Sequence, residues 1–259
     1  MNGSSIRLLA CGVGHRYDAL PVLDVIDLVA EAGRVLVLIG PSGCGKSTLL
    51  GIMGGLIAPT AGTVRMEGHV AADCLNPLTP VFQDFALLPW RSVAGNVSLV
   101  LEGRLPRRER DARVAEVLAL TGLTEFAHAW PRQLSGGMRQ RVGIARALAV
   151  RPACLLMDEP LSALDAQTRA LLLDEFAGLI ERAGTTTVYV THNLNEAVRL
   201  GHRVAVLSRR PGRVRAVVEI DRPIGGRDVT DPGLLTIERE LWEMIRGDAA
   251  AAERERVHA

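Results

Sequence analysis

The stretch that decides the fold reads VLVLIGPSGCGKSTLLGIM and spans residues 35–53. Its first five residues form a continuous apolar run, which predicts a buried strand. The segment GPSGCGKST, residues 40–48, then fits the pattern G-x-x-x-x-G-K-[ST], and the residues after it predict a helix. Glycines in such a loop let backbone N–H groups turn inward around a phosphate chain, and the start of the helix adds a partial positive charge. The stretch therefore predicts a phosphate-binding turn between a strand and a helix.

Lys46 is the only lysine in the sequence, in which Lys and Arg together number 30. Codon bias towards arginine explains why lysine is scarce, but a compact ammonium at this one position also suits a tight site better than a planar guanidinium. We expect Lys46 to bind the β- and γ-phosphates and Ser47 to bind Mg²⁺. The alternative is a plain glycine-rich turn. The residues expected around the phosphates are Gly40, Pro41, Ser42, Gly43, Cys44, Gly45, Lys46, Ser47 and Thr48.

Length and composition exclude several classes of protein. A chain of 259 residues fits one compact domain, because single cores stop growing at roughly 250–300 residues. The formal net charge of +1 gives no electrostatic reason to expect nucleic acid or an anionic membrane surface as a partner. The first residues lack the pattern of a secretion signal, and no apolar run approaches the ~18–20 residues of a membrane span. The cysteines show no metal-ligand spacing, so we expect Cys44 and Cys154 to be small buried fillers in a cytosolic protein.

The spacing of apolar residues changes along the chain and divides it into three parts. Residues 6–70 read as strands and turns, and residues 85–150 take on helical spacing. From Ala153 the apolar strand segments ACLLMDE, TTTVYVTH and HRVAVLS return, with a helical segment after the first. Strands that alternate with helices predict a parallel α/β sheet. After Ile220 a Gly/Pro-rich stretch leads to one helix, which we expect to pack back on the core and to fray from Asp248.

Two strand ends carry candidate catalytic groups. Asp158 and Glu159 follow the apolar run of ACLLMDE, and the carboxyl ends of parallel strands face the ligand crevice. We expect Asp158 to hold Mg²⁺ and Glu159 to orient or deprotonate the attacking water. His192 ends the next strand and is a candidate donor to the γ-phosphate. The alternative for His192 is a plain strand–helix turn in which Asn193 caps the helix.

The segment LSGG, residues 134–137, opens a second helix that is ready to bind phosphate. Ser135 alone is explained as an N-cap. An N-cap does not explain the two glycines, because each glycine weakens a helix start by roughly 0.5–1 kcal/mol. Gly136 and Gly137 make sense where a ligand approaches the backbone closely. This observation predicts a second phosphate contact in the chain.

LSGGMRQRVGIARALAVRPACLLMDEPLSALD, residues 134–165, resembles the signature helix, Walker B strand and D-loop of ATP-binding-cassette (ABC) ATPases. The resemblance spans residues 6–220. It implies a P-loop NTPase fold of the α/β class, with a mostly parallel sheet, an N-terminal antiparallel β subdomain and an inserted α-helical subdomain. The implied division of one nucleotide-binding domain, residues 1–259, is a core of 6–84 and 153–220, a helical subdomain of 85–152 and a tail of 221–259.

The resemblance also assigns roles by position. Two copies pair head to tail, so that Ser135, Gly136 and Gly137 of one copy bind the γ-phosphate of ATP held by Lys46 of the other. Met138 stands where the commonest signature has glutamine, which we interpret as a subfamily trait. The remaining implied roles are adenine stacking by Tyr17, a link from Mg²⁺ to the helical subdomain by Gln83, and coupling of the two sites by Ser162 and Asp165.

Two function classes remain from the sequence. Phe85, Leu87, Leu88 and Trp90 follow Gln83, where subunits of this family dock a permease, although core packing is the alternative for each of them. The segments LSRRPGRV and LLPW resemble nitrate-, sulfonate- and taurine-type importers. This favours an ATPase at the cytoplasmic face of the inner membrane, with integral permease subunits and, indirectly, a solute-binding protein as partners. The alternative is a cassette of an exporter, lipid-trafficking or cell-division complex.

Overall fold

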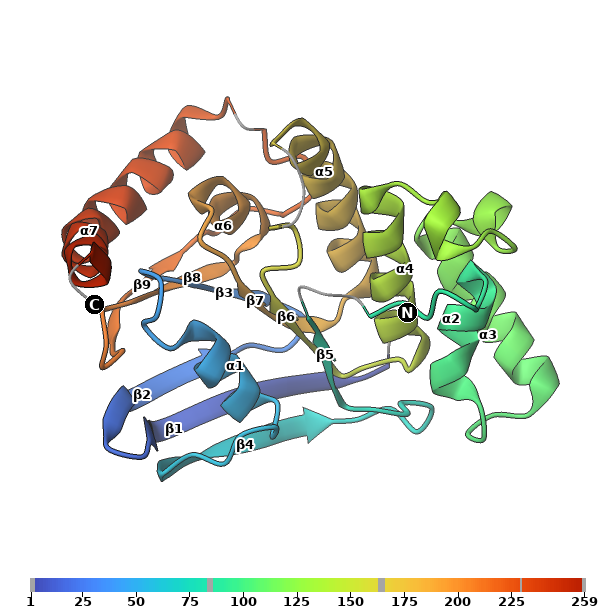
Figure 1. Ribbon diagram of the computed structural model, residues 1–259, viewed down its shortest axis with the longest axis horizontal. Helices are drawn as coiled ribbons and strands as arrows, with labels where there is room; N and C mark the ends of the chain where they lie inside the picture. Colours follow the sequence, from blue (N-terminus) through green and yellow to red (C-terminus); the bar gives the residue numbers. More distant parts are fainter. Residues whose placement is uncertain (1–2, 83–85, 163–165, 229, 258–259) are drawn as a thin grey trace. The chain divides into compact units, whose positions relative to one another are not determined.

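The computed structural model describes residues 3–82, 86–162, 166–228 and 230–257. The chain forms two compact units (Figure 1). The phosphate-loop unit comprises Ser5–His69 and Thr186–Ala259, and the helix-rich unit comprises Met1–Ser4 and Val70–Thr185. The finer division that the sequence suggested stays a prediction.

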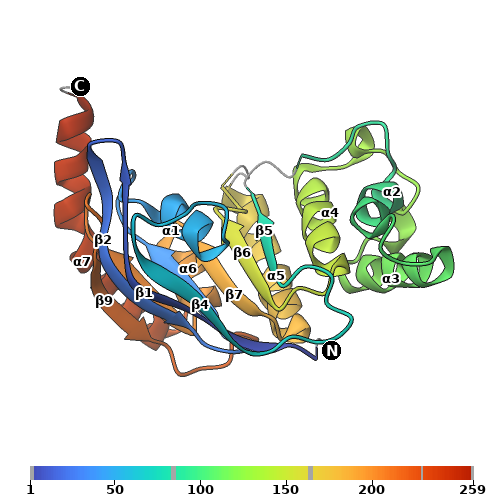
Figure 2. The same cartoon turned by 90° about the horizontal axis from the view of Figure 1, so that it is seen from below.

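The phosphate-loop unit begins with an antiparallel sheet. Its strands are β1 (Ser5–Tyr17), β2 (Leu20–Ala30) and β4 (Ala61–His69), in the order β2-β1-β4. Figure 2 shows the three strands side by side. On β2, Ile26, Leu28 and Ala30 are buried while the residues between them are more exposed, as the alternating sequence predicted.

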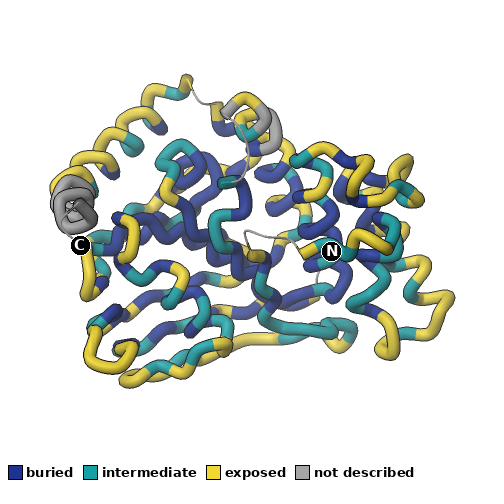
Figure 3. The backbone as a smooth tube through the Cα atoms, viewed as in Figure 1, coloured by how far each residue is buried: buried dark blue, intermediate teal, exposed yellow. Residues whose placement is uncertain are grey.

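The second sheet of this unit carries the phosphate loop. Strands β7 (Thr186–Val190), β3 (Val35–Ile39), β8 (Arg203–Leu207) and β9 (Val214–Glu219) lie in that order, and only β9 is antiparallel to its neighbour. No residue of β3 is more than 1 % exposed. A continuous apolar run is typical of a parallel strand covered on both faces. Helix α6 (Leu194–Leu200) packs against β3, and α1 (Lys46–Met53) packs against β7. All residues of β3 and β7 are buried, and Figure 3 draws buried residues in dark blue.

The C-terminal tail is α7 (Pro232–Val257), which contacts α6 and β8. Leu234 and Leu241 are buried, so the prediction that the tail packs back on the core is confirmed. The expected fraying from Asp248 is wrong, because the helix continues to Val257. Arg227, which precedes the helix, is only 6 % exposed and donates to the carbonyl oxygens of Val198 at 2.7 Å and Gly201 at 2.6 Å.

The helix-rich unit pairs two parallel strands with four helices. The strands are β5 (Leu78–Val81) and β6 (Cys154–Asp158), and the helices are α2 (Val93–Ser98), α3 (Arg107–Leu120), α4 (Gly136–Ala149) and α5 (Ala166–Ala183). Short 3₁₀ turns lie at Leu99–Leu101, Thr124–Phe126 and Pro131–Gln133. Helix α4 packs against α2, α3 and β5 (Figure 2). The helical spacing of α3 buries Val114, Val117 and Leu118, as predicted.

The two units together confirm the expected fold class: parallel strands joined by helices, an N-terminal antiparallel sheet and a helical insertion. Cys44 and Cys154 are buried, as predicted for small fillers. Among the described helices, none combines the length and the apolar character that crossing a bilayer would require.

Candidate functional site

The phosphate loop connects β3 to α1, as the sequence predicted. Lys46 is 7 % exposed, and its Nζ donates to the carbonyl oxygens of Gly40 at 2.9 Å and Pro41 at 3.1 Å. Cys44 N donates to Pro41 O at 3.3 Å, which tightens the turn. These two hydrogen bonds hold the Lys46 ammonium against the backbone of the loop that is expected to bind phosphate. Ser47 follows Lys46 in the first turn of α1 and is exposed.

Glycine is required at the end of this loop for two reasons. Gly45 caps α1 with φ of 102°, a left-handed conformation that L side chains rarely adopt. A Cβ added at Gly45 would also lie 2.7 Å from Leu23 Cδ2. The motif's last glycine thus lets the loop approach β2 closely, and this close approach positions the start of α1.

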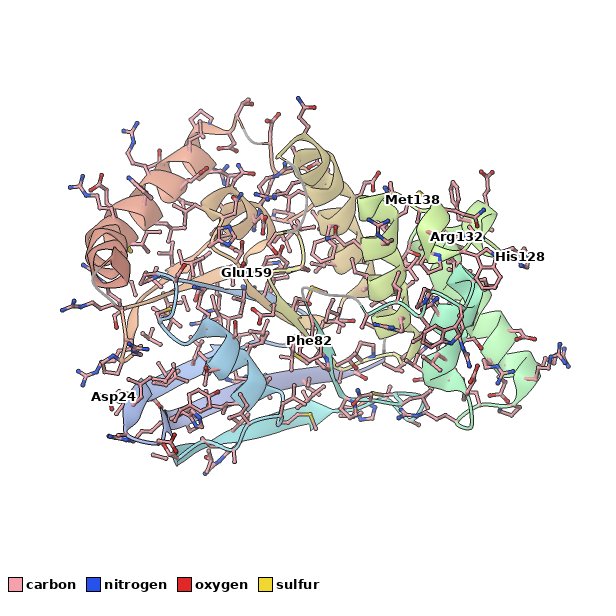
Figure 4. The ribbon with its side chains drawn as sticks, viewed as in Figure 1. Asp24, Phe82, His128, Arg132, Met138 and Glu159 are labelled. Carbon is pink, nitrogen blue, oxygen red and sulfur yellow. The ribbon has the colours of Figure 1, made fainter. Side chains whose placement is uncertain are left out.

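A hairpin between β8 and β9 supports the loop, and sequence reasoning missed it. Gly212 N donates to Val22 O at 2.8 Å, and Asp24 N donates to Gly212 O at 3.0 Å. A Cβ added at Gly212 would lie only 2.2 Å from Cys44 O. Arg213 forms an ion pair with Asp24 of β2, which Figure 4 labels. The hairpin therefore fixes the backbone of the phosphate loop from the side of β2.

Tyr17, the expected adenine-stacking residue, ends β1 and is 48 % exposed. Its ring meets that of His15 edge to face, with centroids 4.6 Å apart and an interplanar angle of 81°. His15 is 6 % exposed, and neither ring nitrogen has a hydrogen-bond partner among the described residues. An exposed aromatic ring held by a buried one is suited to stack on a flat base.

His192 lies exposed in a tightly bonded turn between β7 and α6. Asn193 Oδ1 accepts from Glu196 N at 3.2 Å, so the N-cap named in the alternative for His192 is present. The buried carboxylate of Glu196 accepts from Thr191 Oγ1 at 2.7 Å and from Tyr189 Oη at 2.9 Å. These contacts hold the backbone on both sides of His192 and present its ring to solvent.

Asp158 and Glu159 lie at the carboxyl end of β6, and both are half-buried. Glu159 has φ of 45°, which is uncommon for a residue with a side chain and marks local strain. Its carbonyl oxygen accepts from Ser162 Oγ at 2.7 Å, and Arg169 Nε donates to Leu161 O at 3.2 Å. The turn is thus held from both ends, and Figure 4 labels Glu159 within it.

Ser135 caps α4, as predicted, because its hydroxyl accepts from Met138 N at 3.2 Å. Figure 4 shows Met138 at this end of the helix. Ser135 is exposed and Gly137 is buried. The exposed hydroxyl and the first N–H groups of α4 form an electropositive helix start. The remaining predicted site residues, Gln83 and Asp165, lie outside the described residues.

The segment expected to contact a permease presents an apolar surface. Trp90 is 68 % exposed and Phe82 is 53 % exposed, whereas Leu87 and Leu88 are half-buried. Fully buried Asn96 orders the segment, since its Oδ1 accepts from Leu88 N at 2.7 Å. A cavity of about 440 Å³ adjoins it, with β5, α4 and the 3₁₀ turn Leu99–Leu101 among its walls. Phe85 lies outside the described residues.

The helix-rich unit also contains a charged cluster around Asp73. Asp73 forms ion pairs with Arg151 and, at 3.7 Å, with Arg113. The hydrogen bond from Arg151 holds the pKa of the Asp73 carboxyl below its usual value. Burial raises the pKa of the neighbouring Cys74 thiol, so this cysteine is a poor nucleophile at neutral pH.

Comparisons with known proteins agree with this arrangement. The family model described as ABC transporter matches residues 23–162. An uncharacterized ABC transporter ATP-binding protein of Methanocaldococcus jannaschii is 42 % identical over 238 residues, which cover 91 % of this chain and 87 % of that protein. The taurine import ATP-binding protein TauB of Rhizobium johnstonii is 46 % identical over 194 residues, 74 % of each chain. A solved dimeric ATP-binding cassette in a post-hydrolysis state, bound to ADP and Pi, has a TM-score of 0.67 and 34 % identity, covering 82 % of this chain and 98 % of that chain.

Proposed function

This chain belongs to the ABC transporter family, and from that premise we propose that it is the ATP-hydrolysing subunit of a bacterial importer for a small anionic solute. It is an ATPase of the importer type. The solute class, a sulfonate, taurine or nitrate, rests on the taurine import relative and on the segment LSRRPGRV. In this proposal the permease and the solute-binding protein select the solute, because specificity depends on the residues of a binding site and not on the shared fold.

The observation that carries the proposal is the buried Lys46 ammonium, fixed at the rim of the phosphate loop. A Cβ at Gly45 would meet Leu23 Cδ2 at 2.7 Å, so glycine there preserves the turn from which α1 begins. The residues of 40–48 other than Pro41 supply backbone N–H groups, and Lys46 supplies a point charge for the β- and γ-phosphates. Tyr17 stacks on the adenine with an energy of about 1–3 kcal/mol.

Mg²⁺ would be held by the Ser47 hydroxyl and the Asp158 carboxylate, both hard oxygen ligands, with Gln83 as a further ligand. The ion supplies charge neutralisation at the phosphates when it is bound. Glu159, held in its strained turn, orients and deprotonates the attacking water, and His192 donates to the γ-phosphate. These roles predict that removing the Glu159 carboxylate stops hydrolysis but leaves ATP binding intact.

Dimerisation completes the site in this proposal. Ser135, Gly136 and Gly137 form an electropositive helix start, and in the proposed dimer Met138 lies near the ribose. A second copy places this helix start against the γ-phosphate bound by Lys46, and Asp165 couples the two sites. The dimeric cassette with ADP and Pi among the similar structures supports this pairing.

The apolar segment around Trp90 and the adjoining cavity are the proposed docking surface for a permease helix. Docking there makes the chain a peripheral protein at the cytoplasmic face of the inner membrane. The second candidate, a cassette of an exporter, lipid-trafficking or cell-division complex, uses the same ATPase site. The taurine import relative favours the importer.

Two measurements test the proposal. Glu159→Gln with ATP and Mg²⁺ should form a stable dimer by light scattering, because nucleotide is trapped. Ser135→Arg should stay monomeric, and Glu181→Gln, an exposed carboxylate elsewhere on α5, should behave as the unmodified chain. A Glu159→Gln protein that remains monomeric at saturating ATP contradicts the dimer.

Purification of the tagged chain from membranes in mild detergent then distinguishes the two candidates. Recovery with a stoichiometric multi-span subunit whose binding protein takes a sulfonate or nitrate supports the importer. Recovery with division or lipid-transfer components contradicts it, although the ATPase assignment would stand.

A further inference from the structure

Helix α7 carries two apolar stripes on different faces. Leu234 and Leu241 are 2 % and 0 % exposed, and they lie on the face that packs within the phosphate-loop unit. Leu235 and Trp242, each the next residue in sequence, are 49 % and 51 % exposed. Residues seven apart share one face of a helix, so Leu235 and Trp242 form an outer stripe on a second face of α7 (Figure 2). This helix therefore presents an apolar face that its own unit leaves open to a partner.

Two opposite charges lie within the outer stripe. Glu238 is half-buried and Arg239 is exposed. Among the described residues, neither takes part in an ion pair. Glu238 follows Leu235 by three residues and precedes Trp242 by four, while Arg239 follows Leu235 by four and precedes Trp242 by three. Both charges are therefore neighbours of both apolar side chains on the helix surface, and their spacing is symmetric.

This order of residues is complementary to itself when a second copy of the helix runs in the opposite direction. With Leu235 set against Trp242 of the second copy, Glu238 faces Arg239 of that copy, and Arg239 faces its Glu238. A parallel pairing would instead set each charge against its own kind, which repulsion opposes. A self-complementary patch is what a two-fold symmetric contact requires. We propose that α7 binds α7 of a second copy in antiparallel orientation, through Leu235, Glu238, Arg239 and Trp242.

A membrane surface is the other environment that an exposed tryptophan on such a helix suits. Helices that lie on anionic lipid are rich in lysine and arginine. In residues 232–247 of α7, three glutamates and two arginines give a net charge of −1. This charge does not favour an anionic bilayer, whereas the symmetric spacing of Glu238 and Arg239 fits a second copy.

The α7 contact is separate from the proposed head-to-tail dimer. It uses no residue of the nucleotide site, so it requires no ATP. Four residues from each copy make a small contact, and small contacts are weak. Pairing through α7 should therefore appear only in concentrated samples, whereas the dimer trapped by Glu159→Gln should persist on dilution. Dilution and nucleotide thus distinguish the two contacts.

Sedimentation equilibrium of the full chain without nucleotide, over a series of concentrations, measures the Kd of this pairing. Glu238→Arg and Arg239→Glu each set like charges against each other. Since two-fold symmetry counts each change twice, each variant alone should raise the Kd about tenfold. An equimolar mixture of the two variants again sets opposite charges against each other at both positions, and it should dimerise like the unmodified chain. Arg65→Glu, at an exposed position on β4, is the matched control and should leave the Kd unchanged.

A second variant covers the case in which the charge variants fail to fold. Trp242→Gln should raise the Kd about tenfold or more, and Trp130→Gln, at an exposed tryptophan of the helix-rich unit, should not. Ser135→Arg should pair through α7 as the unmodified chain does, so loss of the ATP-dependent dimer alone contradicts only the proposed function. An unmodified chain that stays monomeric at its highest soluble concentration overturns the α7 pairing. Charge variants that dimerise as the unmodified chain does, or a mixture that stays monomeric, also overturn it.

Discussion

Replacing Gly212 by alanine tests whether the β8–β9 hairpin positions the phosphate loop. An alanine Cβ would lie 2.2 Å from Cys44 O, whereas ordinary contact begins at 3.4 Å. The two backbones must therefore separate by about 1.2 Å. Neither partner is a flexible side chain, so the shift falls on the loop that carries Lys46 or on the hairpin that bonds to β2.

Overpacking of this kind costs about 1–3 kcal/mol. If the phosphate loop moves, that free energy appears as weaker nucleotide binding, and each 1.4 kcal/mol is a factor of about ten. The expected loss of ATP affinity is therefore roughly 5- to 150-fold. A fluorescent ATP analogue measures the Kd, and thermal unfolding measures the stability of the same samples.

Gly247→Ala is the matched control, because an added Cβ there meets nothing within 4 Å. It lies in α7 and should stabilise the helix by about 0.5–1 kcal/mol without changing the Kd for ATP. If Gly212→Ala binds ATP as tightly as the unmodified chain, the hairpin does not position the loop, whatever happens to the melting temperature.

Three further substitutions probe separate contacts. His15→Leu removes the ring that packs against Tyr17 and should raise the KM for ATP severalfold with little change in kcat. His15→Phe keeps an aromatic ring and should restore the original KM. Equal KM values for the two variants would contradict a role for this contact. Glu196→Ala removes the acceptor of two buried hydroxyl groups and should lower the free energy of unfolding by about 1–3 kcal/mol, measured in urea. The Asp73 carboxylate has a pKa below the unfolded value of 3.8, so its ion pairs stabilise the fold above about pH 4 and are lost as the pH falls through the lower, folded pKa. Asp73→Asn should cost only about 0.2–1 kcal/mol at pH 7, because the pair is partly exposed, and this cost should shrink as the pH falls through the folded pKa.

Much of the fold follows from local patterns. The apolar run of β3, the motif that ends at Thr48 and the helical spacing of α3 each depend on neighbours in sequence, and each was found where predicted. The caps at Ser135 and Asn193 followed from the same local chemistry. Such signals are readable because the interaction they describe spans only a few residues.

The features that sequence reasoning missed depend on distant partners. Gly212 is required by Cys44 and Val22, and no local pattern connects it to either. The strained φ of Glu159 arises from the turn that β6 enters, and an acidic residue gives no sign of it. The only local sign of this close contact is the glycine of RRPG, which is Gly212.

Lys46 holds the only ε-amino group of the chain, and it is buried against two carbonyl oxygens. Any reagent specific for lysine therefore reports on a single loop, with no background from the surface. The rate at which such a reagent modifies the folded chain measures how often that loop opens. Arginine side chains do not react with such a reagent, so modification of Lys46 reports local opening of the loop. In a relative with many lysines, the modification of surface lysines would obscure that signal.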